Sequence, residues 1–290
     1  MFYTLINVSF YYQEQQYSPL GKWIVFGFGI IAAILILYKW LETLEFSYAH
    51  YFKKPFFNHV YLTLKKLTKG QRHILKTQFK FYDALSKKHQ AYFEHRVKKF
   101  IDTKTFIGKE ELEITDQMRV LVAATATMLT FGYRNYSLDI VEHIVIYPED
   151  FFSRSNKEYH KGEFNPMVNA IVFSWKDFLE GYEIDNDNLN LGIHELVHAI
   201  HLEAIQENDI TATIFLNTFT QLTGFLEKNE AYKLRLVQSD YIRDYAFTNH
   251  FEFIAVLIEN FIETPQEFKQ HFPEIYLKIK QMLNFNFQGY

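Results

Sequence analysis

A stretch of 16 residues without a charge, Trp23 to Tyr38, constrains the fold of this chain more than any other feature. As a helix it would be roughly 24 Å long, and its apolar extension from Leu20 to Trp40 would be about 31 Å long, which matches the hydrocarbon core of a bilayer. We therefore expect a transmembrane helix at residues 22–41. The alternative is a buried core helix, because the charge-free run is slightly shorter than a usual membrane span.

Positive charges are distributed unevenly around this stretch. Only Lys22 lies on its N-terminal side, whereas Lys39, Lys53 and Lys54 lie on its C-terminal side. Lys and Arg concentrate on the cytoplasmic side of membranes, so this bias predicts an N-terminus outside and a cytoplasmic globular domain. The expected protein is a single-pass membrane protein.

The composition of the whole chain narrows its function. Hydrophobic residues make up 48% of the 290 residues and aromatic residues 18%, which argues against disorder. A net charge of -4 lacks the basic footprint of nucleic-acid-binding proteins, so no nucleic-acid partner is expected. Cysteine is absent, which excludes disulfides, cysteine-ligated zinc and thiol catalysis. Any metal would have to be held by His, Asp or Glu.

Helices dominate the secondary structure that the pattern predicts after the apolar stretch. Residues 55–105 are typical of amphipathic helices with Lys-rich solvent faces, and residues 115–131 of a strongly apolar helix. Short strands are expected at 143–148 and 169–175, where β-branched and aromatic residues lie between turn residues. The fold class is therefore α+β, mainly α-helical, with a small β-sheet. The expected organisation is a short N-terminal segment (1–21), the transmembrane helix (22–41), a helical juxtamembrane linker (42–69) and a globular domain (70–290).

An H-E-x-x-H motif, from His194 to His198, is the strongest indication of function. Residues four apart lie on one face of a helix, so the imidazoles of His194 and His198 can bind one ion, while Glu195 points toward a water on it. Zinc lowers the pKa of such a water to about 7, and Glu195 can take its proton as general base. Residues 185–187 (Asp-Asn-Asp) are candidate N-caps of this helix. The alternative is a structural helix whose polar side chains are hydrogen-bonded in the core.

A tetrahedral catalytic zinc needs a third protein ligand. His201 could share the face of the motif, but it is almost two turns from His194, which makes chelation by all three histidines awkward. Glu252 and Glu259 interrupt an otherwise apolar helix expected at 246–262. They lie about 10.5 Å apart along its axis, so only one can bind the metal, and the other can orient a ligand or meet a basic side chain. Residue chemistry alone leaves open which of them is the ligand.

At this point the chain resembles a known family, that of Mlc titration factor A, whose members are zinc-dependent peptidases. The resemblance extends from about residue 70 to about residue 280 and rests on five sequence blocks. The blocks are HIVIYPEDF (143–151), AIVFSW (170–175), HELVHAIH (194–201), DYAFTNHFEFIAVLIENFIETPQEF (244–268) and HFPEIY (271–276).

The resemblance implies a zincin-like metallopeptidase domain and a set of site residues. By this resemblance a Zn²⁺ ion is held by His194, His198 and Glu252. Glu259 is then the acid that orients a metal ligand, and Tyr245 donates a hydrogen bond to the oxyanion of the reaction. The alternative for Tyr245 is a packing role. His201 stands where the family commonly has Asp, and we expect it to alter the hydrogen bonding that supports the metal ligands.

The leading hypothesis is a membrane-tethered zinc metallopeptidase that hydrolyses peptide or protein substrates on the cytoplasmic side. The strand around Ile171 to Trp175 could be an edge that pairs with an extended substrate, or an ordinary core strand. The second hypothesis is a zinc-containing binding protein that sequesters a regulatory partner such as a transcriptional regulator, with little peptidase activity. The third is a structural domain without metal.

Overall fold

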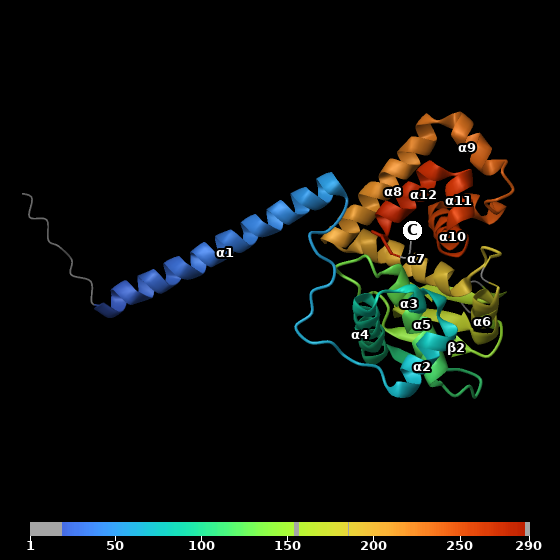
Figure 1. Ribbon diagram of the computed structural model, residues 1–290, viewed down its shortest axis with the longest axis horizontal. Coiled ribbons are helices and arrows are strands. Elements are labelled where there is room, and N and C mark those ends of the chain that lie inside the picture. The colour runs from blue at the N-terminus through green and yellow to red at the C-terminus, as the bar shows by residue number, and fades with distance from the viewer. Residues whose placement is uncertain (1–18, 154–156, 185, 288–290) are drawn as a thin grey trace, which may run out of the picture. The chain divides into compact units, whose positions relative to one another are not determined.

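The computed structural model describes residues 19–153, 157–184 and 186–287 (Figure 1). These described residues form twelve α-helices, two 3₁₀ helices and six strands. The chain divides into two compact units, Met1–Glu45 and Phe46–Tyr290. The expected N-terminal segment at 1–21 lies almost wholly outside the described residues. The mainly helical α+β class predicted from the sequence is confirmed.

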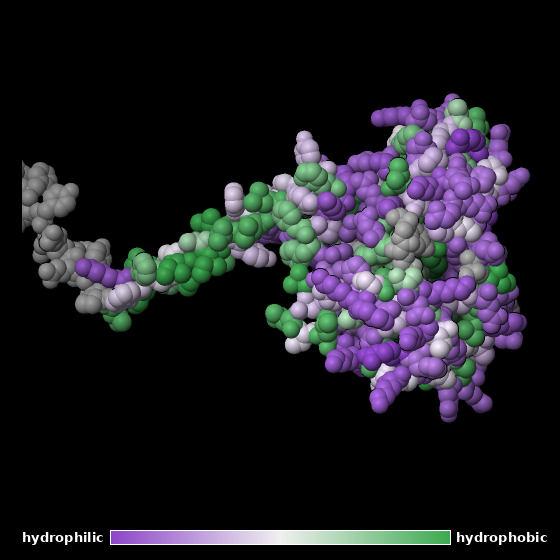
Figure 2. All heavy atoms as spheres, viewed as in Figure 1, coloured by the Kyte–Doolittle hydropathy of each residue, from purple (hydrophilic) through white to green (hydrophobic). Residues whose placement is uncertain are grey.

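Helix α1 (Pro19–Phe52) contains the apolar stretch and is longer than the 22–41 expected for it. From Leu20 to Phe52 the helix is long and apolar enough to cross a membrane. Its most apolar window has a mean hydropathy of 2.3, and 0% of that window is buried. Figure 2 shows the hydrophobic side chains along its surface. The helix continues past residue 41 because no proline interrupts it before Pro55, and it ends where Lys53 adopts a φ of 53°.

Residues 53–68 form no helix, so the prediction of helical structure is wrong for this part of the linker. Tertiary contacts hold the segment in an irregular path. The guanidinium of Arg96 donates to the backbone carbonyl of Asn58 at 2.6 Å and to the Tyr61 hydroxyl at 2.6 Å, and the ring of His59 lies 4.6 Å from that of Phe131. Three helices follow: α2 (Lys69–Gln78), α3 (Lys80–Ala84) and α4 (Lys87–Thr103).

The main sheet has four strands in the order β1-β2-β6-β5. Its strands are β1 (Thr105–Gly108), β2 (His143–Tyr147), β6 (Ala170–Ser174) and β5 (Gly162–Asn165). The first three run parallel, and β5 pairs antiparallel with β6. Strands predicted at 143–148 and 169–175 are confirmed as β2 and β6. Of the two alternatives for the strand around Ile171 to Trp175, the core strand is the one found, because β6 lies between β2 and β5, and β5 is at the edge. A separate hairpin pairs β3 (Phe151–Ser153) with β4 (Glu158–His160).

Helix α7 (Leu191–Gln206) lies between the sheet with helices α2–α6 and the C-terminal helices (Figure 1). The N-cap of α7 is Asn190, whose side chain accepts a hydrogen bond from the Ile193 N–H at 3.0 Å. The prediction of an N-cap at 185–187 is therefore wrong. Asp185 itself lies outside the described residues. Helix α10 (His250–Glu263) packs against α7 and is capped by Asn249. The helix predicted at 115–131 is confirmed as α5 (Asp116–Leu129).

The remaining helices surround α7 and α10 and bury a single large apolar core. They are α6 (Trp175–Glu183), α8 (Ile210–Lys228), α9 (Glu230–Val237), α11 (Pro265–His271) and α12 (Pro273–Met282), with the 3₁₀ helices η1 (Pro166–Val168) and η2 (Asp244–Phe247). The side chains of Ile254, Val256 and Leu257 in α10 are 0% exposed, so this helix is the centre of the core. Any polar side chain on α10 therefore has to find its partners inside the protein.

Candidate metal centre

Helices α7 and α10 bring three potential metal ligands together. Nitrogen or oxygen atoms of His194, His198 and Glu252 all lie within 4.8 Å of one another, and among the described residues this is the group of three or more such side chains that could hold an ion. The Oε2 atom of Glu252 lies 2.9 Å from Nε2 of His194 and 3.5 Å from Nε2 of His198. Two nitrogens and an oxygen form a donor set that suits a catalytic zinc ion.

Local structure explains this convergence. The two histidines are one turn apart on α7, so both rings project from the same face. Asn249 caps α10 by accepting hydrogen bonds from the N–H groups of Phe251 and Glu252, at 2.8 and 3.0 Å. That cap fixes the first turn of α10, and Glu252 projects from this turn toward α7.

Glu259, two turns further along α10, lies behind His194. Its Oε1 atom is 2.7 Å from Nδ1 of His194 and also accepts from the guanidinium of Arg243, while its Oε2 atom accepts from the backbone N–H of Asn190 at 2.9 Å. The side chain is 1% exposed, and both oxygens have partners. A carboxylate in this position fixes the orientation of the imidazole and leaves Nε2 facing the cluster. By contrast, the buried Nδ1 of His198 has no hydrogen-bond partner among the described residues.

The charges around His194 strongly favour a cation. Burial disfavours its charged form, but the hydrogen bonds with Glu252 and Glu259 outweigh burial and raise the pKa of His194 to about 10. Burial likewise opposes the charge on Glu252, yet its hydrogen bonds with His194 and His198 hold its pKa well below the usual range. The site around His194 therefore stabilises positive charge between its carboxylates, which is the electrostatic condition for binding a metal ion.

Glu195 follows the first histidine and approaches the edge strand β5. It is a buried residue, and burial raises its pKa, although the neighbouring histidines act in the opposite direction. The backbone of Phe164 in β5 forms a hydrogen bond with its carboxylate. A Cβ atom at Gly162 would lie 2.6 Å from Cδ1 of Leu191 and 2.8 Å from Cγ of Glu195. Strand β5 can therefore lie this close to α7 only because residue 162 is glycine.

Tyr245 lies in η2, immediately before α10, and its ring centroid is 5.9 Å from that of His194. Burial and the hydrogen bond with Glu252 raise the pKa of Tyr245 to about 12, so its hydroxyl remains protonated and able to donate at neutral pH. The side chain is 51% exposed and lines a cavity of about 300 Å³ beside His194. A protonated phenol at the mouth of a cavity can reach a bound molecule.

Arg243 also lines this cavity, and sequence reasoning did not identify it. The sequence predicts that the acid that does not bind the metal orients a ligand or meets a basic side chain. In the structure Glu259 contacts both His194 and Arg243. The one signal in the sequence for this contact is the position of Arg243, two residues before Tyr245. The sequence gives no stronger signal because the ion pair between Arg243 and Glu259 depends on how η2 packs against α10.

His201 is not brought to the cluster. Its ring packs on those of Phe215, Phe219 and Phe251, with centroids 5.5, 5.0 and 4.5 Å away. Its buried Nδ1 has no hydrogen-bond partner among the described residues, and burial lowers its pKa to about 4. In the structure it is a neutral aromatic-cluster residue and forms no hydrogen bond with the three potential ligands.

Similarity to known proteins places this chain in a family. The model of the glucose-regulated metallo-peptidase M90 family matches residues 57–284. The chain belongs to this family. The resemblance noted from the sequence is thereby confirmed, and the match begins before the expected domain start at residue 70, so it includes part of the irregular segment at 53–68. The chain is also similar to an uncharacterized protein of Synechocystis sp., with 25% identity over 275 residues that cover 87% of this chain and 92% of the relative.

Membership of this family identifies the protein as a metallopeptidase, and a metallopeptidase needs a metal. The cluster of His194, His198 and Glu252 is able to hold one.

Proposed function

We propose that this protein is a zinc-dependent peptidase in which His194, His198 and Glu252 hold the metal. The observation that carries the proposal is the convergence of their donor atoms within 4.8 Å, next to the buried carboxylate of Glu195. Zinc bound by these residues supplies Lewis-acid activation of a water molecule and of the substrate carbonyl. Two nitrogens and one oxygen leave room for such a water, as in other catalytic zinc sites.

In this proposal Glu195 is the general base. Burial raises its pKa above that of an ordinary carboxyl group, which suits a group that both accepts and returns a proton. Glu195 takes a proton from the attacking water and passes it to the leaving amine. The hydrogen bond with Phe164 and the contact with Gly162 hold its side chain in one place while it does so.

Other residues orient the reacting groups. Glu259, itself fixed by Arg243 and Asn190, holds the ring of His194. Tyr245 donates its hydroxyl hydrogen to the oxyanion that develops on the substrate. Strand β5 is at the edge of the sheet and has no second strand partner among the described residues, so it can pair with an extended peptide whose scissile bond lies near Glu195. These contacts favour a peptide or unfolded protein segment as substrate.

We further propose that α1 anchors the enzyme as a single membrane span with the catalytic unit in the cytoplasm. Its exposed apolar surface and the excess of lysines on its C-terminal side support this orientation.

The test compares wild-type full-length protein with Glu195→Gln in detergent, measuring zinc content and hydrolysis of an internally quenched peptide library. We expect about one zinc per chain in both proteins, and a loss of roughly 100- to 10,000-fold in hydrolysis in the variant, because general-base catalysis contributes that factor. Glu113→Gln, at an exposed loop residue, is the matched control and should change neither quantity. Hydrolysis that persists in Glu195→Gln would refute the proposal.

A further inference from the structure

A basic and apolar segment joins α1 to α2. Residues 51–69, which we call the connecting segment, run from the last turn of α1 to the first residue of α2, within the same compact unit as the metal cluster. Large hydrophobic side chains are exposed along it at high density, with seven in its first 14 residues against 13 in the described part of residues 65–287. The seven are Tyr51, Phe52, Phe56, Phe57, Val60, Leu62 and Leu64. Exposed apolar surface concentrated in this way marks an interaction site.

Polar groups of the connecting segment face the protein instead of the solvent. The guanidinium of Arg96 donates to the backbone carbonyl of Asn58 and to the hydroxyl of Tyr61, both at 2.6 Å, and Arg96 itself is 1% exposed. Val60 and Leu62, on either side of Tyr61 in the sequence, are 68% and 103% exposed. The hydrogen bonds on the inner side thus hold the apolar side chains on the outer side. The usual arrangement, with apolar side chains inside and polar groups outside, is inverted here.

Positive charge accompanies this apolar surface. Residues 46–69 contain five lysines and no Asp or Glu, although the whole chain has a net charge of -4. The Nζ of Lys65 is paired with Asp102 at 2.7 Å. By contrast, Lys54, Lys66 and Lys69 are exposed and have no carboxylate partner among the described residues. The connecting segment therefore presents unpaired cations next to its exposed apolar side chains.

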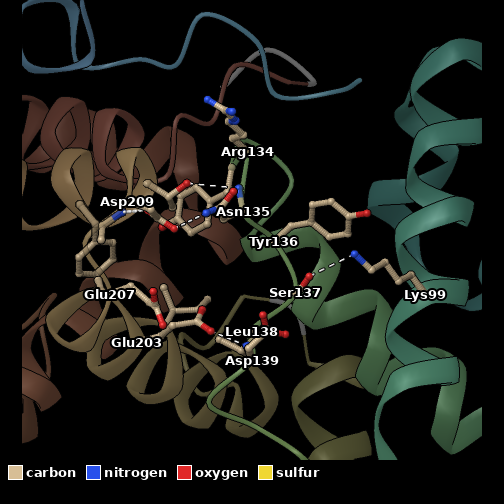
Figure 3. Close-up of a pocket in the computed structure, with 16 residues that line it drawn as sticks. Lys99, Arg134, Asn135, Tyr136, Ser137, Leu138, Asp139, Glu203, Glu207 and Asp209 are labelled. Atoms are coloured by element: carbon tan, nitrogen blue, oxygen red, sulfur yellow. Dashed lines mark hydrogen bonds between the residues drawn. The ribbon is translucent and has the colours of Figure 1, made fainter. Parts of the chain in front are cut away.

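A further cation reaches this surface from the loop that follows α5. The guanidinium of Arg134 lies 4.6 Å from the centroid of the Phe57 ring. Figure 3 shows the Arg134 side chain directed toward the light-blue ribbon of the connecting segment, whereas Lys99 is directed toward Ser137. Arg134 thus adds positive charge to the same surface and packs against one of its exposed aromatic rings.

The length of α1 keeps this surface close to a bilayer. If α1 spans the membrane at residues 22–41, residues 42–52 continue the helix and rise by at most roughly 16 Å beyond the hydrocarbon core. The headgroup region is about 5–8 Å thick on each side, and a tilt of the span brings residue 52 nearer to it. The connecting segment therefore begins within reach of the lipid headgroups.

An anionic lipid surface fits both properties of the connecting segment. Lysines are attracted to acidic headgroups, and aromatic and aliphatic side chains insert between the headgroups and the acyl chains. A second copy of this chain fits less well, because it would bring its own unpaired lysines against those of the first copy. A nucleic acid would match the lysines but would leave the aliphatic side chains without a partner.

We propose that the connecting segment docks the catalytic unit onto the anionic surface of the bilayer that α1 spans. Phe56, Val60 and Leu62 enter the interfacial layer, and the three unpaired lysines contact acidic phospholipid headgroups. The inference rests on the proposed membrane span of α1, but it is independent of the proposed peptidase chemistry.

The experiment places a fluorophore at single positions of the full-length protein in nanodiscs, made of phosphatidylcholine alone or of an equal mixture with phosphatidylglycerol. The chain has no cysteine, so a thiol-reactive fluorophore labels only an introduced one. Leu62→Cys reports on the connecting segment and Ile31→Cys on the span. Leu234→Cys, at a 52% exposed leucine of α9, is the control for the rest of the catalytic unit. Lipids with a doxyl group on the acyl chain quench a label that lies in the bilayer.

The three labels should respond differently to the lipid. We expect the label at residue 31 to be quenched in both kinds of disc and the label at residue 234 in neither. The label at residue 62 should be quenched more strongly in the mixed discs than in phosphatidylcholine. In about 1 M salt, which shortens the screening length to about 3 Å, this difference should disappear.

Lysine variants test the charge directly. The triple substitution Lys54→Gln, Lys66→Gln and Lys69→Gln, made in the chain labelled at residue 62, removes the three unpaired cations. Each lysine near an acidic surface contributes about a fivefold factor, so the ratio of docked to undocked protein should fall by about 100-fold. A matched variant makes the same change of charge at exposed lysines far from the connecting segment in sequence and should leave the quenching unchanged. Its substitutions are Lys109→Gln, Lys228→Gln and Lys233→Gln.

The outcomes separate the docking surface from the span. Quenching at residue 31 together with a label at residue 62 that behaves like the one at residue 234 overturns the docking proposal and leaves the span intact. A label at residue 31 that is not quenched refutes the span, and the docking proposal fails with it. Equal quenching at residue 62 in both lipids and in both lysine variants excludes recognition of acidic headgroups. Quenching at residue 62 that requires two chains per disc assigns the surface to a second copy and also overturns the proposal.

Discussion

Helices α1 and α10 are both strongly apolar, but they lie in opposite environments. No residue in the most apolar window of α1 is buried, whereas the interior residues of α10 are buried among other helices. Their charges differ too, because Lys22 and Lys39 lie at the ends of the apolar stretch of α1, while Glu252 and Glu259 interrupt α10. Apolar content alone therefore does not reveal the environment of a helix. The position of its charges indicates whether the helix faces lipid or carries a buried polar site.

The largest effect is expected when the acid that α10 contributes to the cluster is removed. Glu252→Ala should weaken zinc binding by more than about 100-fold, since loss of an outer hydrogen-bond partner alone costs 10- to 100-fold. Competition with a chromogenic chelator measures the affinity. Glu267→Ala, at an exposed acid of α11, is the control. Unchanged zinc affinity in Glu252→Ala would mean that α10 holds no metal ligand there.

The converse change places a charge in α1. Ile31→Arg lies near the middle of the apolar stretch and should disfavour membrane insertion by about 2.5–3.5 kcal/mol. The membrane-bound fraction after alkaline extraction reports the change. Leu277→Arg is the matched control, because Leu277 is a similarly exposed apolar residue on α12, 59% exposed against 56% for Ile31. If both variants remain equally membrane-bound, α1 is not a span.

A milder change sharpens the distinction between the two acids of α10. Glu259→Gln keeps the shape of the side chain but weakens the hydrogen bond that orients His194, so zinc affinity should fall by about 10- to 100-fold. The same chelator competition measures it. A loss larger than that of Glu252→Ala would reverse the roles we propose for the two residues.

The smallest expected effect is a dependence of zinc affinity on pH. This dependence arises from the acids of α10 and has no counterpart in α1. The pKa of His194 is raised to about 10 in the protein without metal, so the ring is protonated at neutral pH and must lose its proton when a metal binds. Zinc affinity should therefore rise about tenfold per pH unit between about pH 6.5 and 8. Titration in buffers of different ionisation enthalpy should show about one proton released. Membrane association through α1 should not change over this range, and a zinc affinity that falls with rising pH would contradict the argument.

Sequence patterns predicted the parts of the structure that depend on local chemistry. The H-E-x-x-H spacing requires only one helix, and buried acids in an apolar helix require a partner, so His194, His198, Glu252 and Glu259 could all be selected as site residues from the sequence. Strands β2 and β6 were recognisable because their β-branched residues are buried.

The features that were missed depend on tertiary contacts. Strand β5 is only four residues long and includes Gly162 and Glu163, which carry no strand signal, yet it forms the edge next to Glu195. The cap of α7 was misplaced because Asp and Asn at 185–187 look as suitable as Asn190. Asn190 is selected by additional contacts, since its side-chain amide also donates to the carbonyl of Gly181 at 2.6 Å. The irregular path of residues 53–68 likewise depends on Arg96, about 38 residues away in sequence.

The distance in sequence between α7 and α10 has a consequence for synthesis of the protein. Glu252 and Glu259 come 58 and 65 residues after His194, their partner across the cluster. A growing chain that has left the ribosome only as far as α7 exposes two imidazoles and no carboxylate to complete their cage. On the ligand set proposed above, α10 must therefore be translated before a metal is held tightly, and a nascent chain that ends at α7 would lack the proposed hydrolytic activity.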